Sequence, residues 1–270
     1  MLYSQECLPL SSGESITLDV YVPDSVEEGG SPIRRPAVVI CPGGGYRYRS
    51  KREAEPIALR FLSLGFNAFV AGYRVAPHRY PAPQQDLGRA VAHIRANAAR
   101  YLTQPDRIAV LGFSAGGHVA AGLGVLWHRE ALWSEIGLTP QAVKPNAMVL
   151  CYPVITGGPY AHRSSFVHLT GTEDLEAHAA CSLETLVTPA CPPAFLWHTF
   201  QDASVPVQNS YLMAQALAKH HVLTEFHVFP YGGHGASLCN EITSGAEALF
   251  LLPECAVWPE MAARFLQSAM

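Results

Sequence analysis

Seven short apolar runs, with helical patterns between several of them, leave few folds open to this chain. The inner runs, such as residues 147–150, are apolar throughout instead of alternating with polar residues. Strands covered by helices on both faces have this pattern, whereas strands with one solvated face alternate. The order predicts an α/β fold with a doubly wound, mostly parallel sheet. The expected strands are 15–22, 36–41, 66–75, 107–112, 147–154, 194–200 and 224–230, and the expected helices are 85–102, 206–221 and 257–269.

The alternation continues across residues 1–270 without a repeat, linker or low-complexity segment, which predicts a single domain. Residues 155–193 interrupt it with Gly157-Gly158-Pro159, several histidines and only a weak helical signal at 182–187. A long connection within a compact sheet usually carries function. We expect this segment to form a cap-like insertion above the carboxyl ends of the strands, where ligands bind in such sheets.

Composition and charge narrow the classes of partner. With 49% hydrophobic residues, 15% charged residues and a net charge of −4, the chain can bury a large core and lacks the basic excess of a nucleic-acid binder. No apolar stretch approaches a membrane span, and residues 1–6 do not resemble a signal peptide. Seven scattered cysteines without a C-x-x-C pair predict free thiols in a reducing cytoplasm and no zinc site.

The sharpest local signal is a G-x-S-x-G pattern at residues 112–116, with Ser114 at its centre. A strand-like run, 108–111, leads into it, and a helix of small residues, 117–124, leads out. A sharp strand-to-helix turn of this kind exposes the serine at the head of a helix, where the dipole favours developing negative charge. The pattern predicts Ser114 as a nucleophile.

A serine nucleophile needs a base and an acid that orients the base. His234 lies in a glycine-rich loop after the last expected strand, and Asp202 directly follows the strand at 194–200. Asp86 competes for the acid role but is more simply a first-turn carboxylate that complements its helix dipole. Ser114, Asp202 and His234 follow the chain order of α/β-hydrolases. The other candidate bases have simpler structural explanations; they are His118, His220, His221 and His227. The other candidate acids lie in the insertion, where no strand would position them; they are Glu173, Asp174 and Glu184.

Three consecutive glycines follow the strand at 36–41, in the stretch CPGGGYRY. A phosphate-binding P-loop would end in Gly-Lys-Ser/Thr and a dinucleotide fingerprint would need glycine at position 48, and the chain has neither. An oxyanion hole needs backbone N–H groups from such a loop and from the residue after the nucleophile. We expect Gly44, Gly45 and Ala115 to supply them.

The chain resembles α/β-hydrolases of the esterase/lipase superfamily, and within it the acetylxylan-esterase-like carbohydrate esterases of BD-FAE type. The likeness rests on CPGGGY, REAEPIA, YRVAP, GFSAGGHVA, CYPVI, PPAFLWHTFQDASVPV and FPYGGHG, in that order along the chain. It implies the same triad and the same backbone donors. Hormone-sensitive-lipase relatives carry histidine before their glycines, whereas this chain has Pro42. That difference points away from the hormone-sensitive-lipase branch.

These observations predict a serine esterase that removes small acyl groups, with acetyl foremost, from carbohydrates or similar alcohols. No metal or organic cofactor is implied, and the protein is expected to be a monomer or homodimer. Feruloyl esterase, arylformamidase and small-peptidase activities stay open, as does a non-enzymatic binding protein of the same fold. Aromatic faces with hydrogen-bonding tips suit a sugar ring. We therefore expect substrate contacts from Tyr46, Tyr160 and His162, with Tyr48, Phe166 and His168 also shaping the pocket.

Overall fold

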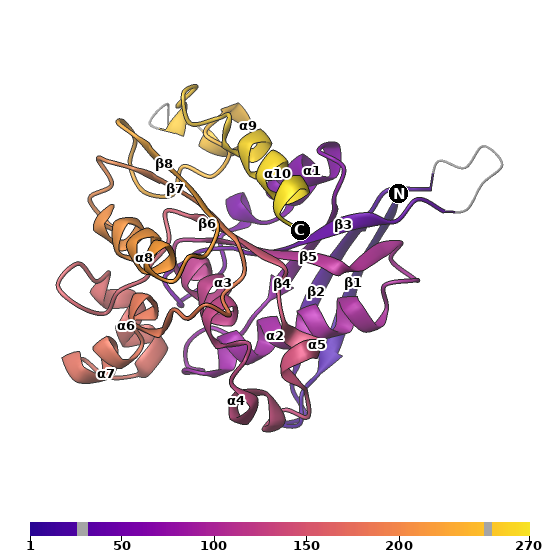
Figure 1. Cartoon of the computed structure of the whole chain (residues 1–270), viewed down its shortest axis with the longest axis horizontal. Helices are drawn as coiled ribbons and strands as arrows, with labels where there is room; N and C mark the ends of the chain where they lie inside the picture. Colours follow the sequence, from indigo (N-terminus) through magenta and orange to yellow (C-terminus); the bar gives the residue numbers. More distant parts are fainter. Residues whose placement is uncertain (26–31, 246–249) are drawn as a thin grey trace.

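The computed structural model describes residues 1–25, 32–245 and 250–270, and an eight-stranded sheet runs through them (Figure 1). The strand order is β1-β2-β4-β3-β5-β6-β7-β8. β2 pairs antiparallel with β1 and β4, and every other neighbouring pair is parallel, which confirms the predicted mostly parallel sheet. The strands are β1 Leu2–Pro9, β2 Ser15–Val22, β3 Arg35–Cys41, β4 Asn67–Gly72, β5 Thr103–Phe113, β6 Ala147–Cys151, β7 Ala194–Thr199 and β8 Thr224–Phe229.

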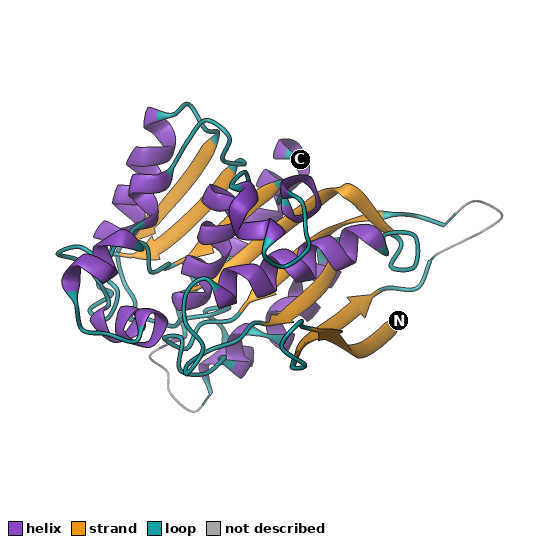
Figure 2. Ribbon diagram, turned by 90° about the horizontal axis from the view of Figure 1, so that it is seen from below, coloured by secondary structure: helices purple, strands orange, loops and turns teal. Residues whose placement is uncertain are grey.

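Helices cover both faces of the sheet (Figure 2). On one face α2, α3 and α8 pack on the strands, and on the other face α1 and α10 do so. The helices are α1 Glu55–Ser63, α2 Ala82–Ala96, α3 Ala115–Leu126, α4 Glu130–Ser134, α5 Pro140–Val143, α6 Arg163–Thr170, α7 Leu175–Ala180, α8 Gln208–Lys219, α9 Glu241–Ser244 and α10 Trp258–Ala269, with short 3₁₀ turns at Lys51–Glu53 (η1) and Leu183–Leu186 (η2).

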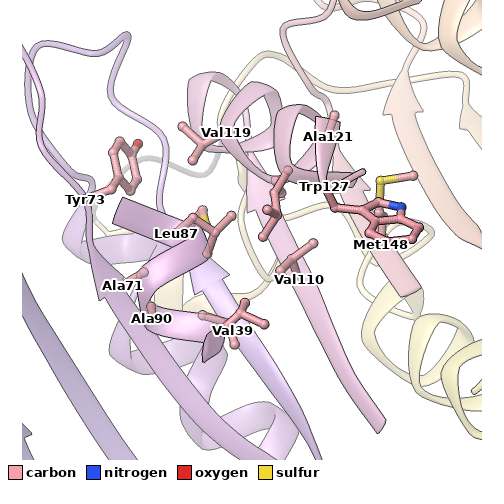
Figure 3. Close-up of a cluster of buried hydrophobic side chains, with 14 of the residues drawn as sticks. Val39, Ala71, Tyr73, Leu87, Ala90, Val110, Val119, Ala121, Trp127 and Met148 are labelled. Carbon is pink, nitrogen blue, oxygen red and sulfur yellow. The ribbon is translucent and has the colours of Figure 1, made fainter. Parts of the chain in front are cut away.

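The two-residue period of a strand builds both layers of the core. In β5, Ile108 and Val110 face the α2 and α3 layer, while Ala109 and Leu111 face α1 and α10. Figure 3 shows the first layer, where Val110 lies close to side chains of α2 and α3. All four of these β5 residues are fully buried, which explains why the inner runs are apolar at every position.

The structure corrects several predicted boundaries. β1 was not predicted because it is an edge strand in which only Leu8 is buried, so it carries no apolar run. α2 begins at Ala82, where Pro83 suits a first turn, and ends at Ala96 instead of residue 102. The side-chain amide of Asn97 donates to the carbonyl oxygen of His93 at 2.9 Å, so it satisfies one of the last carbonyl groups of α2. The predicted strands 66–75 and 147–154 both end about three residues earlier.

The segment 155–193 forms α6, α7 and η2, which lie beside α8 at one end of the molecule in Figure 1. The carboxyl ends of β3, β5, β7 and β8 all open toward this end, because the strands are parallel. The loops that follow them carry the glycine triplet, Ser114, Asp202 and His234. None of the helices in the described ranges is both long enough and apolar enough to span a bilayer.

Candidate active site

Ser114 stands on the turn between β5 and α3, with backbone angles of φ 52° and ψ −120°. A non-glycine residue in this region of backbone space is strained, and such strain persists only where the surroundings impose it. Here the constraint is close packing: a Cβ on Gly116 would lie 2.1 Å from the carbonyl oxygen of Cys41. Glycine at 116 therefore lets α3 start directly against β3 and holds Ser114 at the tip of the turn.

The three side chains that the sequence predicts as a triad lie in a hydrogen-bonded row. Ser114 Oγ lies 2.8 Å from His234 Nε2, and His234 Nδ1 lies 2.7 Å from Asp202 Oδ2. A carboxylate can only accept, so His234 Nδ1 carries the hydrogen and Nε2 is free to accept from the Ser114 hydroxyl. In this tautomer the imidazole can take the serine proton.

Asp202 is buried, and four donors surround its carboxylate. Oδ1 accepts from the backbone N–H groups of Ser204 and Val205, both at 2.9 Å. Oδ2 accepts from His234 and, at 3.2 Å, from His198 Nε2. Burial alone would raise the pKa of Asp202, but the hydrogen bonds from His198 and His234 outweigh it and hold the pKa well below its ordinary value.

The glycine triplet bends over Ser114. Gly44 has φ +128°, and a Cβ there would lie 2.2 Å from the carbonyl oxygen of Tyr48, so only glycine fits this turn. Gly44 and Gly45 line the cavity above Ser114. Ala115 is the first residue of α3, and its N–H has no carbonyl four residues earlier to bond within the helix. That Gly44, Gly45 and Ala115 donate to a developing oxyanion stays a prediction.

The cavity over Ser114 has a volume of about 400 Å³, which is within the range of small-molecule sites. The insertion contributes His162, Ser164 and His168 from the start and middle of α6. Polar side chains and one tyrosine are among the residues that line the cavity. The lining residues are Gly44, Gly45, Arg47, Tyr48, Ser50, Arg52, Glu53, Ser114, His162, Ser164, His168, His234 and Gly235.

Comparison with known proteins shows which family the chain belongs to. The family described as BD-FAE matches residues 18–217. The chain belongs to the BD-FAE family of esterase-type α/β-hydrolases. This confirms the family and the fold that the sequence motifs imply.

Individual relatives of this BD-FAE member agree. It is 36% identical to an acetyl ester-xyloside bifunctional hydrolase from Caldicellulosiruptor lactoaceticus, with a TM-score of 0.78 over 94% of this chain and 88% of the other. It superposes on the carboxylesterase Cest-2923 from Lactobacillus plantarum WCFS1 with a TM-score of 0.87 and 32% identity, over 99% and 97% of the two chains.

Two longer proteins match part of their length. The chain is 35% identical over 214 residues to endo-1,4-beta-xylanase B from Butyrivibrio fibrisolvens, covering 77% of this chain and 34% of the relative. It is 27% identical over 206 residues to acetylxylan esterase from Xylanibacter ruminicola, covering 74% and 40%. The chain thus spans between a third and a half of the length of these curated relatives.

Two predicted substrate contacts of this BD-FAE member do not lie in the cavity, whereas His162 does. Tyr46 is 1% exposed, and its hydroxyl lies 2.7 Å from His118 Nδ1 in the core. Tyr46 also has a positive φ of 58°. Tyr160 is 44% exposed and lies outside the cavity wall. Neither Tyr46 nor Tyr160 therefore lines the cavity over Ser114, contrary to the prediction from the sequence.

Asp86, the alternative acid, is also accounted for. It is buried on α2 and pairs with Arg74, with 2.8 Å between Nη2 and Oδ1, and it accepts from the Arg74 backbone N–H. It lies beyond the first turn of α2, which contains no acidic residue, so the predicted dipole role is wrong. Asp86 ties the strand-end loop at Arg74 to α2.

Sequence reasoning missed three buried polar residues around the row: Glu53, Tyr152 and His198. His198 Nε2 faces two acceptors, Asp202 Oδ2 and the carbonyl of Val205 at 2.9 Å, so it carries a hydrogen and donates. Its Nδ1 lies 2.8 Å from Ser210 Oγ. The sequence does contain a signal for His198, because it is a histidine inside an apolar strand, four residues before the predicted acid Asp202. Within the described ranges, no cluster of three or more metal-binding side chains occurs.

We expect His118 to make the stability of this hydrolase depend on pH. Burial lowers its pKa to about 4, against the backbone hydrogen bond to Cys181, which raises it. The unfolded chain, with an ordinary histidine pKa near 6.5, binds this proton first as pH falls. The free energy of unfolding should therefore fall between about pH 6.5 and 4, by on the order of 3 kcal/mol from this group.

Urea unfolding of wild type and His118→Gln at pH 7.5 and 4.5 checks this expectation. Both proteins lose stability from other groups, so the quantity of interest is the wild-type loss minus the variant loss. We expect the wild type to lose more. Equal losses in the two proteins would contradict the assignment of this pH dependence to His118.

Proposed function

We propose that this BD-FAE member is a serine esterase that removes small acyl groups, with acetyl foremost, from carbohydrates. The observation that carries the proposal is the row of hydrogen bonds from Ser114 through His234 to Asp202 at 2.8 and 2.7 Å, under a cavity of about 400 Å³. The hydrogen-bonding side chains of Tyr48, His162 and Ser164 in the cavity wall suit a sugar better than a long acyl chain.

The proposed reaction runs through an acyl-enzyme. Ser114 Oγ attacks the ester carbonyl carbon while His234 Nε2 takes the hydroxyl proton. The carbonyl oxygen becomes an oxyanion, to which Gly44, Gly45 and Ala115 donate from their N–H groups. His234 then gives the proton to the leaving alcohol oxygen as the ester C–O bond breaks. Asp202 holds the imidazole and stabilises its charged form.

Deacylation repeats the sequence with water. His234 Nε2 takes a proton from water, whose oxygen attacks the acyl carbon of the Ser114 ester. The Ser114 Oγ leaves and receives the proton back, and the carboxylic acid is released. We propose that residues of the cavity wall bind the alcohol part of the substrate. His162 is among them and is the one predicted substrate contact that lines the cavity.

Acetate release from acetylated xylo-oligosaccharides, compared with 4-nitrophenyl acetate, tests the substrate class. The relatives named as acetylxylan esterase and acetyl ester-xyloside hydrolase motivate this choice. We expect kcat/KM to be higher for the oligosaccharide. If only the simple ester were cleaved, the protein would be an esterase that acts on alcohols other than carbohydrates. If a matched anilide or a feruloyl ester were the preferred substrate, the acetyl part of the proposal would be wrong.

Three further predictions remain proposals: a single domain over residues 1–270, a monomer or homodimer, and a cytoplasmic location. The seven cysteines, none of which forms a disulfide in the described residues, support the last of them.

A further inference from the structure

Glu53 is a buried carboxylate that the proposed reaction does not use. It is 4% exposed, ends the η1 turn and lines the cavity over Ser114. Burying a charge is costly unless it is paired or hydrogen-bonded. Among the described residues, no lysine, arginine or histidine lies within ion-pair distance of Glu53 (the ion pairs formed there involve other carboxylates). Two hydrogen-bond donors hold it instead.

The first donor belongs to the oxyanion loop. Glu53 Oε2 accepts from the backbone N–H of Gly43 at 2.8 Å. A Cβ on Gly43 would lie 2.8 Å from this oxygen and 3.0 Å from Ser114 Cβ, so the carboxylate and the nucleophile enclose Gly43 from two sides. Glu53 therefore fixes the loop at the residue just before Gly44 and Gly45.

The second donor is Tyr152, whose ring packs against that of His234. Glu53 Oε1 accepts from the Tyr152 hydroxyl at 2.6 Å, and that hydroxyl accepts from the N–H of Ser237 at 2.9 Å. The Tyr152 ring lies edge-on to the His234 imidazole, with 5.2 Å between the ring centres. Through Tyr152, Glu53 also fixes the loop that carries His234.

We propose that Glu53 is a positioning residue of this hydrolase: one carboxylate holds the oxyanion loop and the His234 loop in register with Ser114. The inference rests on the proposed function. Glu53 would not touch the reacting atoms, so its removal should impair the transition state more than substrate binding. Both neighbours donate to it, which requires an acceptor at each oxygen and explains why glutamate and not glutamine stands here.

Glu53→Gln keeps the size of the side chain and puts an amide NH₂ where one acceptor stood. We expect kcat for 4-nitrophenyl acetate to fall by about 10- to 100-fold, since a misplacement near 1 Å costs about that much, with KM within about twofold. Rates are expressed per active serine, counted by a fluorophosphonate reaction run to completion. A loss of folded protein then cannot imitate the effect.

Tyr152→Phe provides the second arm, because it removes the hydroxyl and leaves the Gly43 bond intact. We expect a smaller loss of kcat, and a loss in the double variant well below the product of the two single losses, since the residues act as one unit. Asp86→Asn is the matched control: it also removes a buried carboxylate, paired with Arg74 away from the cavity. It should lower the melting temperature and leave kcat per active serine unchanged.

Ser114→Ala, assayed in parallel, distinguishes a failure of the esterase proposal from a failure of the positioning role of Glu53. If Ser114→Ala is inactive and Glu53→Gln keeps kcat within twofold, the positioning role is overturned and the esterase proposal stands. If Ser114→Ala retains turnover, both are overturned. Should Glu53→Gln not fold, a wild-type kcat in Tyr152→Phe overturns the positioning role on its own.

Discussion

Ser114→Ala should lower kcat for acetyl esters by about 10⁶-fold, the scale found when a serine nucleophile is removed. The variant loses the Oγ that lies 2.8 Å from His234 Nε2 and keeps the cavity and the backbone donors. A residual rate of about 10³-fold over water is expected from the oxyanion hole and binding alone. Stability should change little, because alanine meets the same backbone strain at φ 52° as serine does.

The measurement is steady-state hydrolysis of 4-nitrophenyl acetate, with thermal unfolding recorded for each protein. Ser134→Ala is a matched control, since Ser134 is an exposed serine at the end of α4. It should behave as wild type in both assays. Turnover of Ser114→Ala within tenfold of wild type would refute the nucleophile assignment.

The residues of the hydrogen-bonded row could be found from the sequence because topology limits where they stand. In a parallel sheet the chemistry gathers at the carboxyl ends of strands, and Ser114, Asp202 and His234 each follow an apolar run. Glycines around Ser114 and His234 mark tight turns. These signals are local, so a single sequence carries them.

Tyr46 and Tyr48 show where local signals fail. The two residues lie two positions apart in the sequence, yet Tyr46 is buried, whereas Tyr48 is 60% exposed and lines the cavity. Tyr46 has a positive φ, and tyrosine at such an angle has no sequence signature. Composition alone assigns both rings the same role.

Glu53 escaped prediction for another reason. In sequence it is an acidic residue just before a helix, a position that ordinarily complements the helix dipole. Its partners, Gly43 and Tyr152, are 10 and 99 residues away along the chain, so only the fold brings them together. The motif REAEPIA marked the segment by resemblance, but the resemblance gave Glu53 no role.

Asp202→Asn should lower kcat by about 10⁴-fold at neutral pH, because the structure determines how the amide must lie. The backbone N–H groups of Ser204 and Val205 both donate to Oδ1, so the amide oxygen is held there and the NH₂ takes the place of Oδ2. That NH₂ would face the N–H of His198, and it would donate to His234 Nδ1.

His234 would then carry its hydrogen on Nε2, and the nitrogen beside Ser114 could no longer accept the hydroxyl proton. Kinetics of Asp202→Asn and of Asp174→Asn test this, because Asp174 also accepts a backbone N–H, from Glu176 at 3.1 Å, but at the exposed start of α7. The Asp174 variant should keep the wild-type kcat. A loss below tenfold in Asp202→Asn would mean that the imidazole finds its working tautomer without the carboxylate, and that His234 is oriented by its glycine-rich loop and Tyr152 instead.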